Sequence, residues 1–261
     1  FAAAAVVVRT GADPQFTDCT IVDTEGSAVL AAERAQGAVR DCRLTRVGSP
    51  AVVVEERSTL RFTGTTVAES SGVGMLVASQ STPLVENCRI ESPGAQGVVL
   101  MQQAEPEIRG LQIDKPAGYG VHVLERSGGT FGECTVSAPQ DVGVWIADSS
   151  PAFADLCVND AVGKAVVVTE NGKVSFRELN LGRAGGTALE VRGSSVTIND
   201  GSMSGTDADG MLLLDKASLE AEDVVVSGVA GNGIRISEHS SADLRSVTVS
   251  DSGETNVLVS D

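Results

Sequence analysis

A small residue returns every 22 or 23 positions along the whole chain, and this period limits the possible folds more than any other feature. Nine of the eleven steps between these residues are equal, and the other two are shorter by one because a residue is missing before position 10 of the unit. A fixed period of this length is the sequence signature of a solenoid, in which similar units stack on one another. The first residues of the units are Ala5, Ala28, Ala51, Gly74, Gly97, Gly120, Gly143, Ala165, Ala188, Gly210, Gly233 and Asn256.

Within each unit the apolar residues occupy fixed positions that alternate with period two. Position 2 is apolar in every unit, from Val6 to Val257, and position 4 is aliphatic or Ala from Val8 to Val259. Positions 15 and 17 alternate in the same way, whereas no segment has helical periodicity. Period-two alternation is typical of strands. The sequence therefore predicts an all-β chain with three short strands in each unit.

Three short strands cannot bury their own apolar faces, but units stacked as successive coils can do so together. We therefore expect a parallel β-helix of about eleven coils of about 22–23 residues, spanning residues 1–261 as one domain and forming a fragment of a larger multidomain protein. Position 14 of most units is Asp, Asn or Glu, and short polar side chains of this kind favour tight bends. We expect a bend there, before the third strand.

Three stretches carry a resemblance to a known superfamily: "GVGMLVASQSTPLVENCRI", "GVVLMQQAEPEIRGLQI" and "GVHVLERSGGTFGECTV". They resemble the right-handed parallel β-helix repeats of the pectate-lyase-like fold, and the likeness extends over essentially the whole chain. Such repeats occur in polysaccharide lyases and hydrolases, and as plain non-catalytic modules in F-box receptors or beside AAA ATPase domains. The resemblance implies the fold more strongly than a function.

Charge and composition exclude several classes of partner. Lys and Arg total 19 against 35 Asp and Glu, so the net charge is −16. Such a surface repels nucleic-acid phosphates and anionic lipids, and every apolar run is too short to span a membrane. Five Cys, an odd number with no CxxC motif, predict reduced thiols and a cytoplasmic location. We expect no cofactor and no metal, because the loop 199–210 matches no calcium motif.

The sequence does not predict an enzyme. Every unit closes within a single period of the repeat, so no long insertion is available to form the wall of a groove. At outward position 3 the distinctive groups are His122, Trp145, Glu190 and Arg235. At about 4.8 Å per coil, His122 and Glu190 lie three coils or roughly 14 Å apart, too far for a paired-carboxylate type of geometry.

Tyr119, His122 and Trp145 form a possible ligand patch. They include the only Tyr, the only Trp and one of the two His residues of the chain, a combination suited to stacking on a sugar. The alternative is that a solenoid face simply accommodates a few large side chains.

An apolar stripe is predicted on the outward side of the first strand, and the Gly or Ala at position 1 is expected to leave that surface flat. Contiguous apolar surface of this size suggests an interface, although β-propensity or a covering segment is an alternative. The predicted function is a non-enzymatic protein-interaction or scaffolding module that binds a protein partner or itself; the alternative is a carbohydrate-binding or carbohydrate-active (lyase- or hydrolase-like) β-helix. The predicted interface residues are Val7, Leu30, Val53, Leu76, Val99, Met101, Leu124, Trp145, Val167, Leu212, Leu214 and Leu258.

Overall fold

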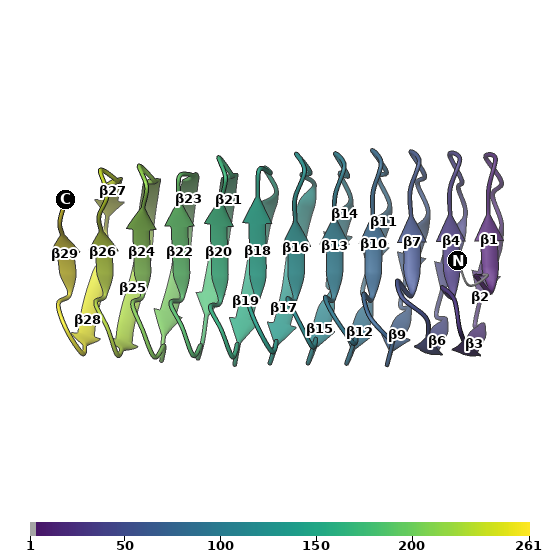
Figure 1. Ribbon diagram of the computed structural model, residues 1–261, viewed down its shortest axis with the longest axis horizontal. Helices are drawn as coiled ribbons and strands as arrows, with labels where there is room; N and C mark the ends of the chain where they lie inside the picture. The colour runs from purple at the N-terminus through teal and green to yellow at the C-terminus, as the bar shows by residue number, and fades with distance from the viewer. Residues whose placement is uncertain (1–3) are drawn as a thin grey trace.

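One strand from each coil forms a continuous parallel sheet along the length of the molecule (Figure 1). The computed structural model describes residues 4–261, and within them each strand of this sheet pairs with its equivalent one coil away, as Val6 pairs with Val29. We call this sheet the strand-one face. Its strands are β1 (Val6–Val8), β4 (Val29–Ala31), β7 (Val52–Val54), β10 (Met75–Val77), β13 (Val98–Leu100), β16 (Val121–Val123), β18 (Val144–Ala147), β20 (Val166–Thr169), β22 (Leu189–Arg192), β24 (Met211–Leu214), β26 (Ile234–Ile236) and β29 (Val257–Val259).

The remaining strands form the other faces of the rod, again in parallel from coil to coil. The first five coils and coil eleven have two short strands each, as predicted, whereas in coils six to ten these two join into one bent strand. The short strands are β2 (Gln15–Thr17), β3 (Thr20–Thr24), β5 (Ala38–Arg40), β6 (Arg43–Val47), β8 (Arg61–Thr63), β9 (Thr66–Ala68), β11 (Leu84–Glu86), β12 (Arg89–Glu91), β14 (Glu107–Arg109), β15 (Gln112–Asp114), β27 (Ser241–Arg245) and β28 (Thr248–Ser252). The joined strands are β17 (Thr130–Ser137), β19 (Ala152–Asn159), β21 (Lys173–Leu181), β23 (Ser195–Ser204) and β25 (Ser218–Val229).

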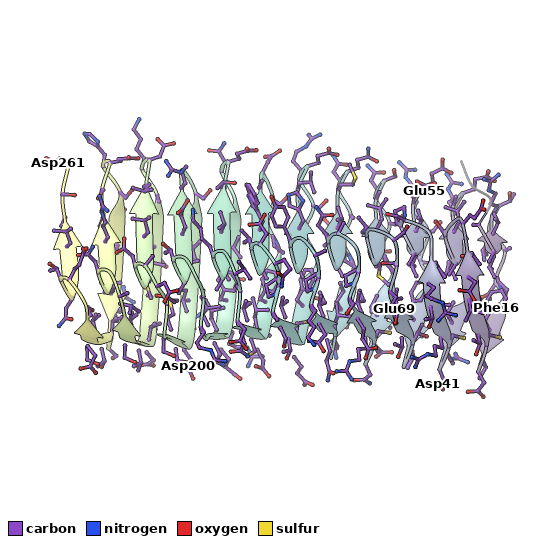
Figure 2. All side chains as sticks on the ribbon, turned by 60° about the horizontal axis from the view of Figure 1, so that its bottom comes forward. Phe16, Asp41, Glu55, Glu69, Asp200 and Asp261 are labelled. Atoms are coloured by element: carbon purple, nitrogen blue, oxygen red, sulfur yellow. The ribbon has the colours of Figure 1, made fainter. Side chains whose placement is uncertain are left out.

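The bend predicted at position 14 is confirmed. Asp18, Asn87 and Gly110 have φ of 53°, 51° and 62°, and the equivalent residues of the other coils are also left-handed. Asn, Asp and Gly adopt this conformation at the lowest cost. Figure 2 shows two of the bend residues, Asp41 and Asp200, along one edge of the rod. The bend sends the chain into the third side of each coil.

The core is a stack of equivalent side chains. Phe131, Phe153 and Phe176 lie on three successive coils with ring centroids 4.5 and 5.3 Å apart, and all three are buried. Aromatic rings gain stability beyond burial in such offset stacks. Cys42 and Cys134 are buried free thiols, as expected for small core residues.

Position 1 has a different role from the one predicted. A Cβ added to Gly120 would lie 2.3 Å from a methyl carbon of Val136, on the inner side of the same coil. Ala28 and Ala51, at the same position, are fully buried. The prediction that small residues here flatten the outer surface is therefore wrong, because they make room for the core side chain at position 17.

Serines close the turn after several strands of the strand-one face. Ser58 Oγ accepts from the amide of Ala35, Ser81 Oγ accepts from the amide of Ser58, and both distances are 3.1 Å. Ser149 Oγ accepts in the same way from the amide of Ser127, at 3.2 Å. Buried amides need such partners, so these serines stabilise the edge of the strand-one face.

The predicted extent of the domain, 1–261, includes three residues outside the described part of the chain. Between residues 4 and 261 there is no helix of the length and apolarity needed to cross a membrane.

Candidate functional site

The three residues of the predicted ligand patch lie together on the strand-one face. Tyr119 precedes β16, and His122 on β16 pairs directly with Trp145 on β18. The ring centroid of Tyr119 is 5.2 Å from that of His122 and 5.0 Å from that of Trp145. Trp145 Nε1 donates a hydrogen bond to Thr169 Oγ1 on β20, at 3.3 Å. The result is a half-buried aromatic surface with a fixed indole ring.

Burial keeps this aromatic surface uncharged. It lowers the pKa of His122 below the ordinary 6.5, so the imidazole is neutral at pH 7. Burial, followed by the charge of Asp141, raises the pKa of the Tyr119 hydroxyl. Both rings can therefore pack against an apolar surface of a ligand and still offer hydrogen-bonding groups at their edges.

Two open depressions meet at Trp145. One, of about 320 Å³, lies on the Tyr119 side, and the other, of about 880 Å³, extends over β20 and β22 to the turn that follows β24. Trp145 and Glu170 line both of them. We call the two together the Trp145 groove.

A buried carboxylate lies in the larger depression. Glu190 is on β22, and its side chain is only 9% exposed. Lys164 Nζ donates to Glu190 Oε2 at 2.6 Å, and Arg192 lies 3.9 Å from the other carboxylate oxygen. Sequence reasoning missed this pair, although Glu190 is the only acidic residue at position 3 of any coil.

Two shortened turns border the groove. An ordinary coil turns after the strand-one face through two left-handed residues, such as Glu125 and Arg126 with φ of 55° and 59°. Coil seven, which carries Trp145, has only Asp148 in this conformation before Ser149. Coil seven therefore lacks the residue that occupies the seventh position of the ordinary repeat.

The same residue is missing from coil nine, which carries Glu190. Gly193 is the single left-handed residue there, with φ of 55°, and it lines the larger depression. The structure therefore corrects the expectation that a groove requires long insertions, because here the groove forms beside turns that are shorter than the rest.

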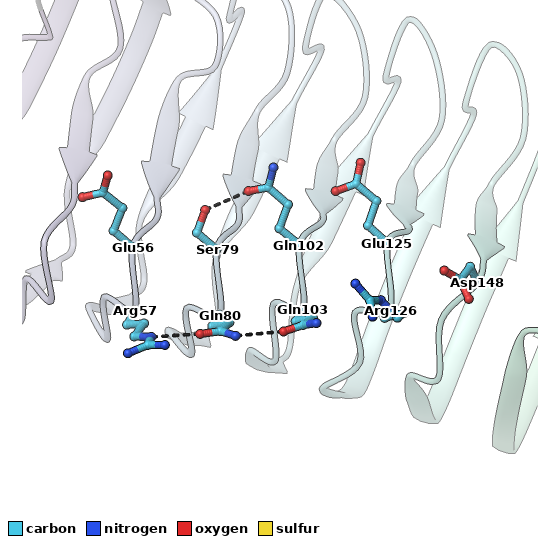
Figure 3. Close-up of a pocket in the computed structure, with 9 residues that line it drawn as sticks. All are labelled: Glu56, Arg57, Ser79, Gln80, Gln102, Gln103, Glu125, Arg126 and Asp148. Carbon is cyan, nitrogen blue, oxygen red and sulfur yellow. Dashed lines mark hydrogen bonds between the residues drawn. The ribbon is translucent and has the colours of Figure 1, made fainter.

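A third depression, of about 640 Å³, follows the turns of earlier coils, and we call it the turn shelf (Figure 3). It has two rows of polar side chains at the sixth and seventh positions of successive coils. Gln80 donates to Gln103 and accepts from Arg57, both at 2.8 Å. The residues that line it are Glu56, Arg57, Ser79, Gln80, Gln102, Gln103, Glu125, Arg126 and Asp148.

The predicted apolar stripe is mostly shielded by its neighbours. Val53 and Val167 are buried, with 6% and 5% exposure, and Val7 at the end of the sheet is 50% exposed. The other predicted interface residues are half-buried. No group of three or more His, Cys, Asp or Glu residues that could hold a metal occurs within residues 4–261.

The sequence identifies the family. A family model described as "Right handed beta helix region" matches residues 3–157, more than half of the chain. The chain belongs to the right-handed β-helix family. This confirms the resemblance found in the repeats. No curated protein matches the sequence of this chain.

Solved structures of the same fold include proteins that act on carbohydrates. A double mutant of the periplasmic alginate epimerase AlgG matches with a TM-score of 0.72 and 14% identity, over 89% of this chain and 65% of that one. The catalytic unit of a GH87 alpha-1,3-glucanase from Streptomyces thermodiastaticus matches with a TM-score of 0.56 and 13% identity, over 98% of this chain and 64% of that one. The Agl-KA catalytic domain matches with a TM-score of 0.58 and 10% identity, over 97% of this chain and 61% of that one. The β-helix thus spans less than two thirds of each, and at these identities the likeness shows the fold alone.

These structures correct the predicted function. The prediction of a scaffolding or docking module is wrong, because the similar structures include an epimerase and a glucanase and none of those named above is a scaffold. The alternative prediction, a carbohydrate-binding or carbohydrate-active β-helix, is not overturned by them.

Proposed function

We propose that the Trp145 groove binds a carbohydrate chain. The observation that carries the proposal is that Tyr119, His122 and Trp145 are in contact where two depressions meet. Ligand sites typically combine an apolar or aromatic wall with a few polar groups that fix orientation. A sugar ring presents both an apolar C–H face and hydroxyls, so it suits a wall of this kind.

The polar groups of the groove can hold sugar hydroxyls. Lys164 Nζ is fixed by Glu190 and retains further N–H donors, since an ammonium has three. Arg192, on the same strand as Glu190, lines the same depression. Glu190 and Arg192 lie on β22 of the strand-one face, which is held rigid by its parallel pairing from coil to coil, and Lys164 lies two residues before β20.

A carbohydrate-active site is a second candidate, and Glu190 is the observation in its favour. It is a buried carboxylate whose position is fixed by Lys164, and Asp141, Glu170 and Asp215 line the same depression. Glycoside hydrolysis uses two carboxyl groups about 5–9.5 Å apart. Under this candidate Glu190→Gln abolishes turnover of a bound glycan while binding persists, and mass spectrometry of the reaction mixture detects the product.

The binding proposal has a direct test, because Trp145 is the only Trp and its fluorescence reports the groove alone. A glycan array selects ligands, and titration of the selected glycans should shift the Trp145 emission. Trp145→Ala should reduce binding measured by calorimetry at least about tenfold, as buried Trp contacts commonly do. Leu30→Ala, at the equivalent position of coil two, is the matched control and should bind normally. If the protein binds no glycan on the array and no glycan shifts the Trp145 emission, the proposal fails.

The shortened turns give an independent test. Insertion of one Asn between Asp148 and Ser149 restores the ordinary turn of coil seven beside Trp145. Circular dichroism should remain that of the native β-helix, and glycan affinity should fall. Native affinity in a folded insertion variant would show that the short turn does not open the site.

A further inference from the structure

The turn shelf and the Trp145 groove form one continuous track. The shelf shares Glu125 and Asp148 with the smaller Trp145 depression, which in turn shares Trp145 and Glu170 with the larger one. The track runs from Glu56 in coil three to the turn of coil ten. At about 4.8 Å per coil, seven steps make roughly 34 Å, which is longer than a short oligosaccharide requires.

The middle of the turn shelf is uncharged and offers both donors and acceptors. Ser79 Oγ donates to Gln102 Oε1 at 2.8 Å, and Gln80 Nε2 donates to Gln103 Oε1 at 2.8 Å. Within residues 4–261 the Nε2 groups of Gln102 and Gln103 donate no hydrogen bond, so they can donate to a ligand. Hydroxyl groups match carboxamides because each can donate and accept.

The charges of the track do not suit an acidic polysaccharide. Seven acidic and five basic side chains line it, a net charge of −2, in a chain whose total charge is −16. Lys164, the basic group nearest the buried Glu190, is already neutralised by it. A polymer with one carboxylate per sugar would find no surplus of positive charge here and would be repelled at longer range.

We propose that the track binds an uncharged, hydroxyl-rich polysaccharide, and that the amides of Gln102 and Gln103 bind the part of the chain that extends beyond the Trp145 groove. The proposal rests on the proposed function and adds to it the class of the ligand and a second subsite. The shelf contributes to affinity only when the ligand is long enough to reach it.

The experiment compares ligand charge and ligand length. Neutral gluco-, manno- and xylo-oligosaccharides, as disaccharides and octasaccharides, are titrated against the full chain by calorimetry and Trp145 fluorescence. Oligogalacturonates and oligomannuronates of the same lengths are titrated alongside. At least one neutral octasaccharide should bind about tenfold or more tightly than its disaccharide, since a few added hydrogen bonds supply that factor. The uronates should bind more weakly than the neutral glycans, and most weakly at low salt.

The shelf is tested by the double variant Gln102→Ala/Gln103→Ala. It should lower the affinity of the octasaccharide to that of the disaccharide and leave the disaccharide unchanged. Gln112→Ala, an exposed glutamine on β15 outside the track, is the matched control and should change neither.

Each contrary result has a separate meaning. Uronates that bind more tightly than neutral glycans, with Trp145→Ala abolishing binding, overturn the neutral ligand and leave the Trp145 groove as a carbohydrate site. Equal affinities for short and long neutral glycans, or a double variant without effect, overturn the second subsite. Absence of binding by every glycan overturns this inference and the proposed function together.

Discussion

Removal of Lys164 should destabilise the strand-one face by an amount that the geometry allows us to estimate. Lys164→Met keeps most of the side-chain volume but removes the ammonium 2.6 Å from Glu190 Oε2. Loss of one partner from a fully buried pair costs about 3–5 kcal/mol, and an exposed pair contributes about 0–1 kcal/mol. Here the Glu190 side chain is 9% exposed and that of Lys164 is 39% exposed, and Arg192 remains 3.9 Å away. We therefore expect a loss between these two limits, of about 1–2 kcal/mol.

A double-mutant cycle separates the ion pair from other effects of the substitution. Glu190→Gln removes the buried charge and leaves Lys164 free to reach water, so it should cost less than Lys164→Met. The double variant should be closer to wild type than Lys164→Met alone, with a coupling energy of about 1 kcal/mol. Urea unfolding at pH 7 is followed by circular dichroism for the whole rod and by Trp145 fluorescence near the pair.

The reasoning is refuted by one simple result. If Lys164→Met unfolds within about 0.3 kcal/mol of wild type by both probes, a difference no larger than the usual error of additivity, Glu190 does not depend on the ammonium, and the electrostatic account of the site is wrong. A loss equal in Lys164→Met and in the double variant would likewise assign the effect to packing rather than to charge.

Three other predictions follow from the buried groups. Burial raises the pKa of Cys88 to about 11 and that of Cys134 to about 12. At pH 8 iodoacetamide should therefore label neither in the folded protein and should label the half-buried Cys19 and Cys157 first. Early label on Cys88 in mass spectrometry would contradict this. Because burial holds the pKa of His122 below 6.5, the unfolded state takes up a proton first as the pH falls below 6.5, and the free energy of unfolding should decrease toward the folded-state pKa. Urea unfolding from pH 7.5 to 5 checks the slope, which His122→Asn should reduce. Ser81→Ala should cost about 1–3 kcal/mol in urea unfolding, because the buried amide one coil earlier loses its acceptor; no loss would mean that another group replaces the hydroxyl.

The fold could be predicted because the same physical requirement recurs in every coil. Inward positions such as that of Phe153 must be apolar in each unit, and the bend at Asp18 must tolerate a left-handed backbone. A repeated requirement leaves a repeated pattern, so a period-two alternation inside the longer period of the coil is visible in the sequence alone.

The site could be predicted only in part. Tyr119, His122 and Trp145 were predicted as a patch because their types are rare in this chain, and the register places them in contact. The Lys164–Glu190 pair was missed because its members occupy different positions of the repeat and lie 26 residues apart. Comparison of equivalent positions cannot reveal a contact between side chains that start from different positions and converge in the groove.

The breaks in the period contain more information about function than the period does. A turn of a solenoid is fixed by the turns above and below it, so loss of one residue must preserve their hydrogen bonds. It does so here, since the amide of Arg126 still donates to the carbonyl of Asp148 at 2.7 Å and the amide of Asn171 to that of Gly193 at 3.1 Å. Stacking therefore neither requires nor forbids the deletion, and what the deletion changes is the space at the edge of the strand-one face. Both deletions fall at that edge, in the coils of Trp145 and Glu190. Departures from an otherwise consistent pattern are expected at functional sites, so the two shortened turns support the Trp145 groove as the candidate site independently of the aromatic residues.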